Sequence, residues 1–197
     1  NDRWSTMISG HGERQNSSSD HNHDGFRDEP DIIQYNLFNR WDYMTGKFTF
    51  RTGFRYLGEE RVGGQFAYQP GNPDTWSDGF GILINTTRLE GFAKVGGVFG
   101  ENGNLSIGWI QNAAYHNQKS SIGRRLYDGL QKTYYTNLLF QWNPGTGRHT
   151  IDAGLSYKYD LYDEKLDALA FGREESVPGI FAQYTYTDSA LVTVIAG

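Results

Sequence analysis

The 197-residue sequence contains no cysteine, which excludes a disulfide scaffold and a cysteine-rich zinc site. It also lacks any run of about 18 apolar residues, so it predicts no transmembrane helix. No basic segment followed by an apolar stretch opens the chain, so we recognise no signal peptide. Excess positive charge is missing too, because the formal net charge is −5. That charge gives no reason to expect a nucleic-acid partner.

The aliphatic residues that fill a globular core are scarce. The hydrophobic fraction is 37%, whereas aromatic residues make up 15% of the chain and glycine occurs 25 times. Tyrosine, phenylalanine, tryptophan and threonine suit strands that are apolar on one face and wet on the other. The mean hydropathy of −0.64 agrees with such strands, because lipid-facing and lumen-facing residues average out.

Apolar and polar residues alternate with a period of two along much of the chain. Phe48, Phe50 and Phe54 share one face of a predicted strand, and Arg51 and Arg55 lie on the other. Seven segments follow this pattern: 33–43, 48–56, 89–99, 105–115, 134–142, 151–161 and 180–186. Two partial strands cover 4–10 and 191–196. The charged residues predicted to line an interior are Arg51, Arg55, Arg88, Glu90, Lys94, Asp152, Lys158 and Asp160.

The predicted connections alternate between short and long. Tight turns are expected at 45–47, 100–103, 144–147 and 188–189, and long polar loops at 11–30, 60–83, 117–130 and 162–177. Segments of about 10 to 14 residues exceed the usual strand length and can cross a bilayer when tilted. Aromatic residues gather near the strand ends, as at membrane interfaces.

We therefore predict an all-β fold, an antiparallel transmembrane β-barrel segment of about eight strands. It would have short periplasmic turns and long extracellular loops, and would cross the bacterial outer membrane several times. Outer-membrane lipid is then a partner. Both ends of the chain fall within predicted strands, so we interpret residues 1–197 as an internal part of a barrel.

Residues 20–31 match the twelve-residue calcium loop at its spaced ligand positions. Gly25 permits the sharp bend, whereas Asp31 stands where the pattern has glutamate, so bidentate closure is less assured. The predicted Ca²⁺ ligands, in a structural site on an extracellular loop, are Asp20, Asn22, Asp24, Phe26 (through its carbonyl), Asp28 and Asp31.

Two alternatives apply to the same loop. Asparagine, aspartate and glycine also form turns that hold no metal. His21 and His23 lie between the calcium ligands and would suit a transition metal, but alternation points them away from Asp20, Asn22 and Asp24.

A second candidate site lies in the predicted loop 117–130. Arg124, Arg125 and Tyr127 would contact an anionic or chelated substrate there. The alternative is that these side chains pair with neighbouring acidic residues or are solvated. No nucleophile-elbow or zinc-hydrolase spacing occurs, so we predict no enzyme.

Several motifs, in order along nearly the whole chain, resemble TonB-dependent outer-membrane receptors of Bacteroidetes type, in the cobalamin and metal-chelate branch. They are Asp24-Gly25-Phe26, Gln34 to Trp41, Glu60 to Gln65, Gly123 to Gly129 with Tyr135, Asn137 and Leu138, and Glu175 to Gly179 with Tyr184 to Tyr186.

The resemblance implies a 22-stranded barrel closed by an N-terminal plug, which imports a scarce nutrient using force from the TonB complex. The chain contains neither the plug nor a TonB box, so TonB would act through a part absent from residues 1–197. Implied substrates are cobalamin, a ferric siderophore or haem, with a peptide or a glycan as lesser options, and a surface lipoprotein is a further partner. Two rival interpretations are a complete small barrel with an adhesive or enzymatic role and a secreted, calcium-stabilised carbohydrate-binding β-sandwich.

Overall fold

The computed structural model describes residues 3–16, 19–68, 70, 79–100, 102–145, 147–188 and 192–197. These residues form one antiparallel sheet of nine strands rather than about eight. The strands are β1 (Trp4–Gln15), β2 (Asp31–Met44), β3 (Phe48–Gly64), β4 (Gly81–Phe99), β5 (Leu105–Ile122), β6 (Arg125–Trp142), β7 (His149–Leu166), β8 (Leu169–Asp188) and β9 (Val192–Ala196).

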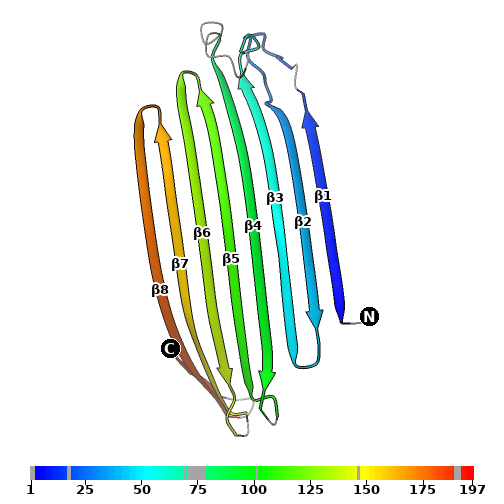
Figure 1. The fold of residues 1–197 in the computed structure, drawn as a ribbon, viewed down its shortest axis with the longest axis vertical. Coiled ribbons are helices and arrows are strands. Elements are labelled where there is room, and N and C mark those ends of the chain that lie inside the picture. Colours follow the sequence, from blue (N-terminus) through cyan, green and yellow to red (C-terminus); the bar gives the residue numbers. More distant parts are fainter. Residues whose placement is uncertain are drawn as a thin grey trace.

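Every strand pairs with its neighbours in the sequence, so the sheet is a meander (Figure 1). The strands β1 and β8 lie on opposite sides of the picture, and β9 pairs only with the end of β8. In the described part of the chain β1 and β9 make no contact, so the sheet is open.

The sheet is a single layer and has almost no core. Its accessible surface is 13174 Å², whereas a compact monomer of this mass would expose about 9,400 Å². Val62 and Tyr68 are the buried hydrophobic residues among those described, whereas Phe54 and Leu155 are 46% and 55% exposed. No described segment forms a helix long and apolar enough to cross a membrane. The sandwich interpretation is therefore wrong, because a sandwich needs a second sheet packed on the first.

The connections at the two ends of the sheet agree with the prediction in part. The turn of residues 45–47 connects β2 to β3 at what we call the short-turn end, where β4 to β5 and β6 to β7 also connect. The opposite end, the loop end, carries the longer connections 16–30 and 65–80. The predicted turn at 188–189 begins at the last residue of β8, and Ser189 lies outside the described residues.

Two of the four predicted long loops are wrong. Residues 117–130 and 162–177 continue as strand, and two-residue turns close the hairpins at Gly123-Arg124 and Asp167-Ala168. The first residue of each turn has positive φ, 57° for Gly123 and 54° for Asp167. Glycine adopts this conformation freely and aspartate does so more readily than most residues. The strands β5 to β8 therefore extend past the segments that alternate in the sequence.

Candidate functional site

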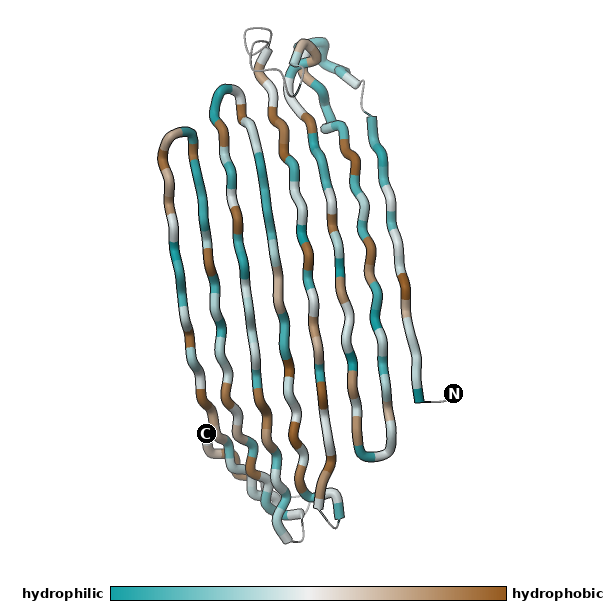
Figure 2. The backbone as a smooth tube through the Cα atoms, in the orientation of Figure 1, coloured by the Kyte–Doolittle hydropathy of each residue, from teal (hydrophilic) through white to brown (hydrophobic). Residues whose placement is uncertain are grey.

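One face of the sheet carries an apolar band without charge. Register places Phe50, Val95, Trp109, Leu138 and Leu155 side by side on this apolar face across five strands. Figure 2 shows the matching alternation of hydrophobic and hydrophilic residues along each strand.

Aromatic residues bound the band at both ends on most strands. Nine residues from Phe48 to Tyr56 cover about 30 Å of strand, which a tilt of about 40° reduces to roughly 23 Å. Between the two boundaries no described residue on the apolar face is charged. The boundary at the loop end is formed by Tyr35, Tyr56, Leu89, Tyr115, Tyr134 and Tyr159, and that at the short-turn end by Trp4, Tyr43, Phe48, Phe99, Trp142 and Tyr184.

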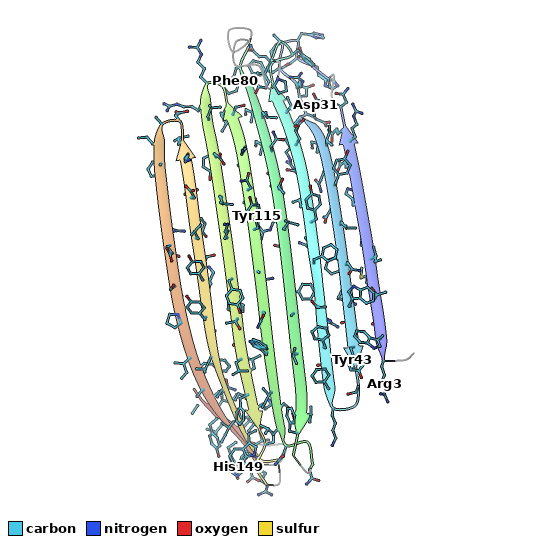
Figure 3. The ribbon with its side chains drawn as sticks, in the orientation of Figure 1. Arg3, Asp31, Tyr43, Phe80, Tyr115 and His149 are labelled. Carbon is cyan, nitrogen blue, oxygen red and sulfur yellow. The ribbon has the colours of Figure 1, made fainter. Side chains whose placement is uncertain are left out.

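The aromatic rings of the short-turn boundary pack against one another. The ring of Tyr43 lies 4.7 Å from that of Trp4 and 6.3 Å from that of Phe48, between centroids. His149 Nδ1 lies 2.6 Å from the Tyr184 hydroxyl. Figure 3 shows Tyr43 and His149 near this end of the sheet, and Tyr115 far from it. Such amphipathic rings suit the boundary between hydrocarbon and water.

The opposite, polar face carries the charged residues, most of them in ion pairs. Asp42 accepts from Arg51 and pairs with Arg40 at 2.8 Å. Glu90 pairs with two cations, Arg88 on its own strand at 2.6 Å and Arg55 on the neighbouring strand β3 at 3.7 Å.

The same pattern continues on β7. Lys158 Nζ lies 2.5 Å from Asp160, which is 2% exposed and also accepts from Thr133. The eight residues predicted to line an interior all share the polar face. A groove of about 570 Å³ opens at the short-turn end and includes Ser106, Leu139 and Asp152 of this face.

The first half of the predicted calcium loop forms a tight turn. The Asp20 carboxylate accepts hydrogen bonds from the backbone N–H of Asp24 (3.1 Å) and Gly25 (3.0 Å). The Asn22 amide donates to Asp24 Oδ2 at 2.9 Å, and Asp24 Oδ1 accepts from the N–H of Phe26 at 2.8 Å. Gly25 has a φ of 81°, as its predicted role in the bend requires. The turn therefore brings Asp20, Asn22 and Asp24 together.

The last two predicted ligands have other partners. Asp28 accepts from the His21 ring at 2.6 Å and from Ser19 Oγ at 2.9 Å, and Asp31 pairs with Arg27 at 3.4 Å. The hydrogen bond from the His21 ring, with a further one from the His21 N–H, holds the pKa of Asp28 below 3.8. No group of three or more His, Asp or Glu side chains in the described part of the chain is arranged to hold a metal ion.

Backbone hydrogen bonds tie this loop to the start of the next long connection. The N–H of Arg27 donates to Gly64 O, and the N–H of Phe66 donates to Gly25 O, each at 3.0 Å. The Arg27 guanidinium also donates to Gln65 O at 2.8 Å and lies over the Phe66 ring. The two long connections of the loop end therefore form one unit.

The second candidate site differs from its prediction, because Arg125 and Tyr127 belong to β6 and only Arg124 lies in a turn. Arg125 pairs with Asp167 at 2.7 Å, and the Tyr127 hydroxyl donates to Glu164 at 2.7 Å. These bonds agree with the alternative of pairing with acidic neighbours. Arg125 and Tyr127 share one face of β6, and their contact with a substrate stays a prediction.

Two connections were missed by the sequence analysis. Asp167 accepts from the Leu126 N–H at 2.8 Å as well as from Arg125, and so joins the β7–β8 turn to β6. Tyr68, 3% exposed, folds back so that its hydroxyl lies 3.0 Å from Ser121 Oγ. Neither connection has a local signal, because 41 and 53 residues separate the bonded pairs.

No family model matches the sequence. No curated protein matches it either. The fold is similar to the ferric yersiniabactin uptake receptor FyuA from Yersinia pestis, with a TM-score of 0.50 and 11% identity over 95% of this chain and 33% of that chain. It is also similar to the ferric citrate transporter FecA, with a TM-score of 0.53 and 10% identity over 96% of this chain and 32% of that chain.

The chain spans about a third of the length of each of these structures. At this identity the likeness concerns the fold. The nine antiparallel strands form an open sheet that matches part of a TonB-dependent receptor barrel, which confirms the predicted fold class.

Proposed function

We propose that this sheet is part of the transmembrane barrel of a TonB-dependent receptor that takes up a scarce nutrient across the bacterial outer membrane. The observation that carries the proposal is the uncharged apolar band, bounded by aromatic residues, opposite a face of ion-paired charges. Such a division suits a sheet that touches hydrocarbon on one side and encloses protein or water on the other.

The open edges support a larger barrel. Unpaired strand edges are costly in hydrocarbon, and a closed barrel removes them. Residues 1–197 are then one part of the barrel, and further strands and a plug belong to other parts of the same protein. TonB would act through that plug.

The substrate we propose is a metal chelate. The two structural neighbours are named for ferric yersiniabactin and ferric citrate. Together with the sequence resemblance, these names favour a ferric siderophore, haem or cobalamin as the cargo. A surface lipoprotein is the further partner that the resemblance implies.

Quenching by brominated lipids tests the membrane orientation. Trp109 lies well inside the apolar band and Trp142 at its short-turn boundary. The test uses variants that keep only one tryptophan. Lipids brominated near the end of the acyl chains should quench the fluorescence of Trp109 more than that of Trp142, and lipids brominated near the headgroup should reverse the order. Equal, weak quenching of both residues by every lipid would contradict the orientation.

Uptake by the source bacterium tests transport. Deletion of the gene should abolish uptake of one labelled chelate among cobalamin, haem and ferric siderophores, and with it growth when that chelate is limiting. A plasmid copy of the gene should restore both. Unchanged uptake of all three classes would overturn the proposed cargo.

We also propose that the loop of residues 20–31 binds Ca²⁺ as a structural ion. The supporting observation is that the oxygens of Asp20, Asn22 and Asp24 gather around one tight turn. Asp28 and Asp31 would have to leave His21 and Arg27 to complete a shell of six to eight oxygens.

Calcium titration tests this part separately. Millimolar Ca²⁺ should slow hydrogen exchange of the N–H groups of residues 20–31, because extracellular sites bind with dissociation constants of about 10⁻⁴ to 10⁻³ M. Asp20→Ala should remove the effect and Glu29→Gln should retain it. Equal exchange with 10 mM Ca²⁺ and with chelator would show a turn that holds no metal.

A further inference from the structure

Half of the lysines of this protein lie on one patch of the outward side of the sheet. The sequence has six lysines, and Lys119, Lys132 and Lys165 occupy neighbouring strands on the apolar face. Lys119 and Lys165 lie beyond the aromatic boundary on the side of the loop end, and Lys132 lies at this boundary, paired in register with Tyr115. Tyr115, Tyr134 and Tyr159 are the last residues of the band on the same three strands. The patch therefore begins where the hydrocarbon would end.

Register defines the geometry of this lysine patch. Lys119 and Lys165 flank Asp128 from the two adjacent strands, which sets their Cα atoms about 10 Å apart. Lys132 lies nearer the band, between Tyr115 and Leu161. A cavity of about 190 Å³ opens between the strands, lined by Asn117, Lys119, Asp128, Leu130, Asp163 and Lys165.

The lysines of the patch differ from most cations of the polar face, because no ion-pair partner lies within 4 Å of them in the described part of the chain. Among the described residues, no salt bridge involves Lys119, Lys132 or Lys165, although Asp128 and Asp163 are close in register. By contrast, Arg40, Arg51, Arg88 and Lys158 each pair within 4 Å. Three long cationic side chains at the edge of an apolar band are thus available to an external anion.

We propose that the lysine patch binds the phosphate of an anionic lipid in the adjoining leaflet. Such a lipid would lay its acyl chains on the apolar band below and present its phosphate at the level of the three ammonium groups. Long lysine stems reach along apolar surface while the charged head stays in the interface. Basic residues near a membrane surface each strengthen anionic lipid binding appreciably. The proposal rests on the membrane orientation proposed above and is independent of the cargo.

The two carboxylates make a specific contribution. Asp128 and Asp163 reduce the formal charge of the three lysines from +3 to +1, and Glu174 lies on the same face two strands from Lys132. These carboxylates weaken the binding of any headgroup that carries no strong negative charge of its own. Replacement of Asp128 and Asp163 by asparagine should therefore increase lipid binding while lowering its selectivity.

Native mass spectrometry of the purified protein in detergent micelles tests the proposal. Dimyristoylphosphatidylglycerol is the anionic probe and dimyristoylphosphatidylcholine the zwitterionic one. The protein should prefer the anionic lipid, and each Lys→Gln change at residues 119, 132 and 165 should lower that preference roughly fivefold. Asp128→Asn with Asp163→Asn should raise the affinity for the anionic lipid.

Lys94→Gln is the matched control, because Lys94 lies on the polar face within the band span. It should leave the lipid preference unchanged. The proposal is overturned if the triple Lys→Gln variant keeps the preference or if Lys94→Gln removes as much of it. It is also overturned if 10 mM inorganic phosphate displaces the lipid fully, because the patch would then be a site for soluble anions.

Gel mobility before and after heating shows whether each variant is folded. Chelate uptake is measured separately, so a result that contradicts the proposed cargo does not affect this test of lipid binding.

Discussion

At the scale of single residues, the position of a charge relative to the aromatic boundary decides its effect. Leu155 and Lys165 lie on the same strand and the same face, yet Leu155 is in the middle of the apolar band and Lys165 is beyond its end. A charge at the position of Leu155 would lie in hydrocarbon, whereas the Lys165 ammonium lies in the interface. The alternation of side chains along the strand assigns both residues to the same face, so it does not distinguish the hydrocarbon environment from the interface.

Leu155→Arg should destabilise the protein folded in phospholipid vesicles by about 2–4 kcal/mol, because arginine is costly at the bilayer midplane. Thr87→Arg is the matched control on the same face, just beyond the Leu89 boundary, and should cost about 0–1 kcal/mol. Urea unfolding followed by tryptophan fluorescence measures both values. Equal costs for the two variants would refute the depth that we assign to the band.

Asp167 gives a prediction on pH. The Leu126 N–H, and then Arg125, hold the pKa of this carboxyl below 3.8. Because the pKa is lower in the folded state, the bond stabilises the hairpin at neutral pH. This contribution declines as the pH falls below about 4 and is lost through the folded-state pKa.

Titration of the Asp167 carboxyl by ¹³C NMR measures this shift. Arg125→Gln should raise the pKa only part of the way to 3.8, since the backbone donor, which is the larger cause, remains. A pKa at or above 3.8 in the unmodified protein would contradict the bond.

At the scale of the elements, the strands have two parts with different sequence signals. In β5 the alternation from Leu105 to Tyr115 predicts a strand, and the structure confirms it. From Asn117 to Ile122 both faces of the strand become polar or mixed, because this part of β5 lies beyond the apolar band. The period-two signal disappears although the hydrogen bonds continue. The predicted loops 117–130 and 162–177 were wrong for this reason.

The turn at Gly123 tests how firmly this extension is held. Gly123→Ala should destabilise the β5–β6 tip by about 1–2 kcal/mol, because φ is +57° and a Cβ would approach the Phe80 ring to 3.2 Å. Gly46→Ala, where φ is not positive and no atom lies within 4 Å of a new Cβ, should have little effect. Hydrogen exchange of the N–H groups of residues 117–130 should rise in the first variant only. Equal exchange in both would mean that the tip tolerates side chains at Gly123.

At the scale of the whole molecule, the sheet has no second layer to bury its apolar face. The exposed residues of the band, such as Ile180 at 82% exposure, need an apolar solvent to gain the stability that a core provides in a globular protein. The free edges of β1, of β9 and of the longer part of β8 that β9 does not pair with need partner strands as well.

The isolated chain should therefore aggregate in plain buffer and disperse in detergent micelles. Size-exclusion chromatography with light scattering, in buffer with and without dodecyl maltoside, measures this difference. A compact, stable monomer in detergent-free buffer would contradict both the apolar band and the open edges.

The sequence by itself determined the all-β class, the seven alternating segments, the two sets of side chains on opposite faces, and the tight bend at Gly25. These features follow from local rules, because a period of two assigns each residue to a face. The tertiary structure alone decided the register, the length of the extensions, the partners of Asp28 and Asp167, and the gathering of three lysines at the edge of the band. These features depend on contacts between residues that are far apart in the chain, and no local pattern encodes them.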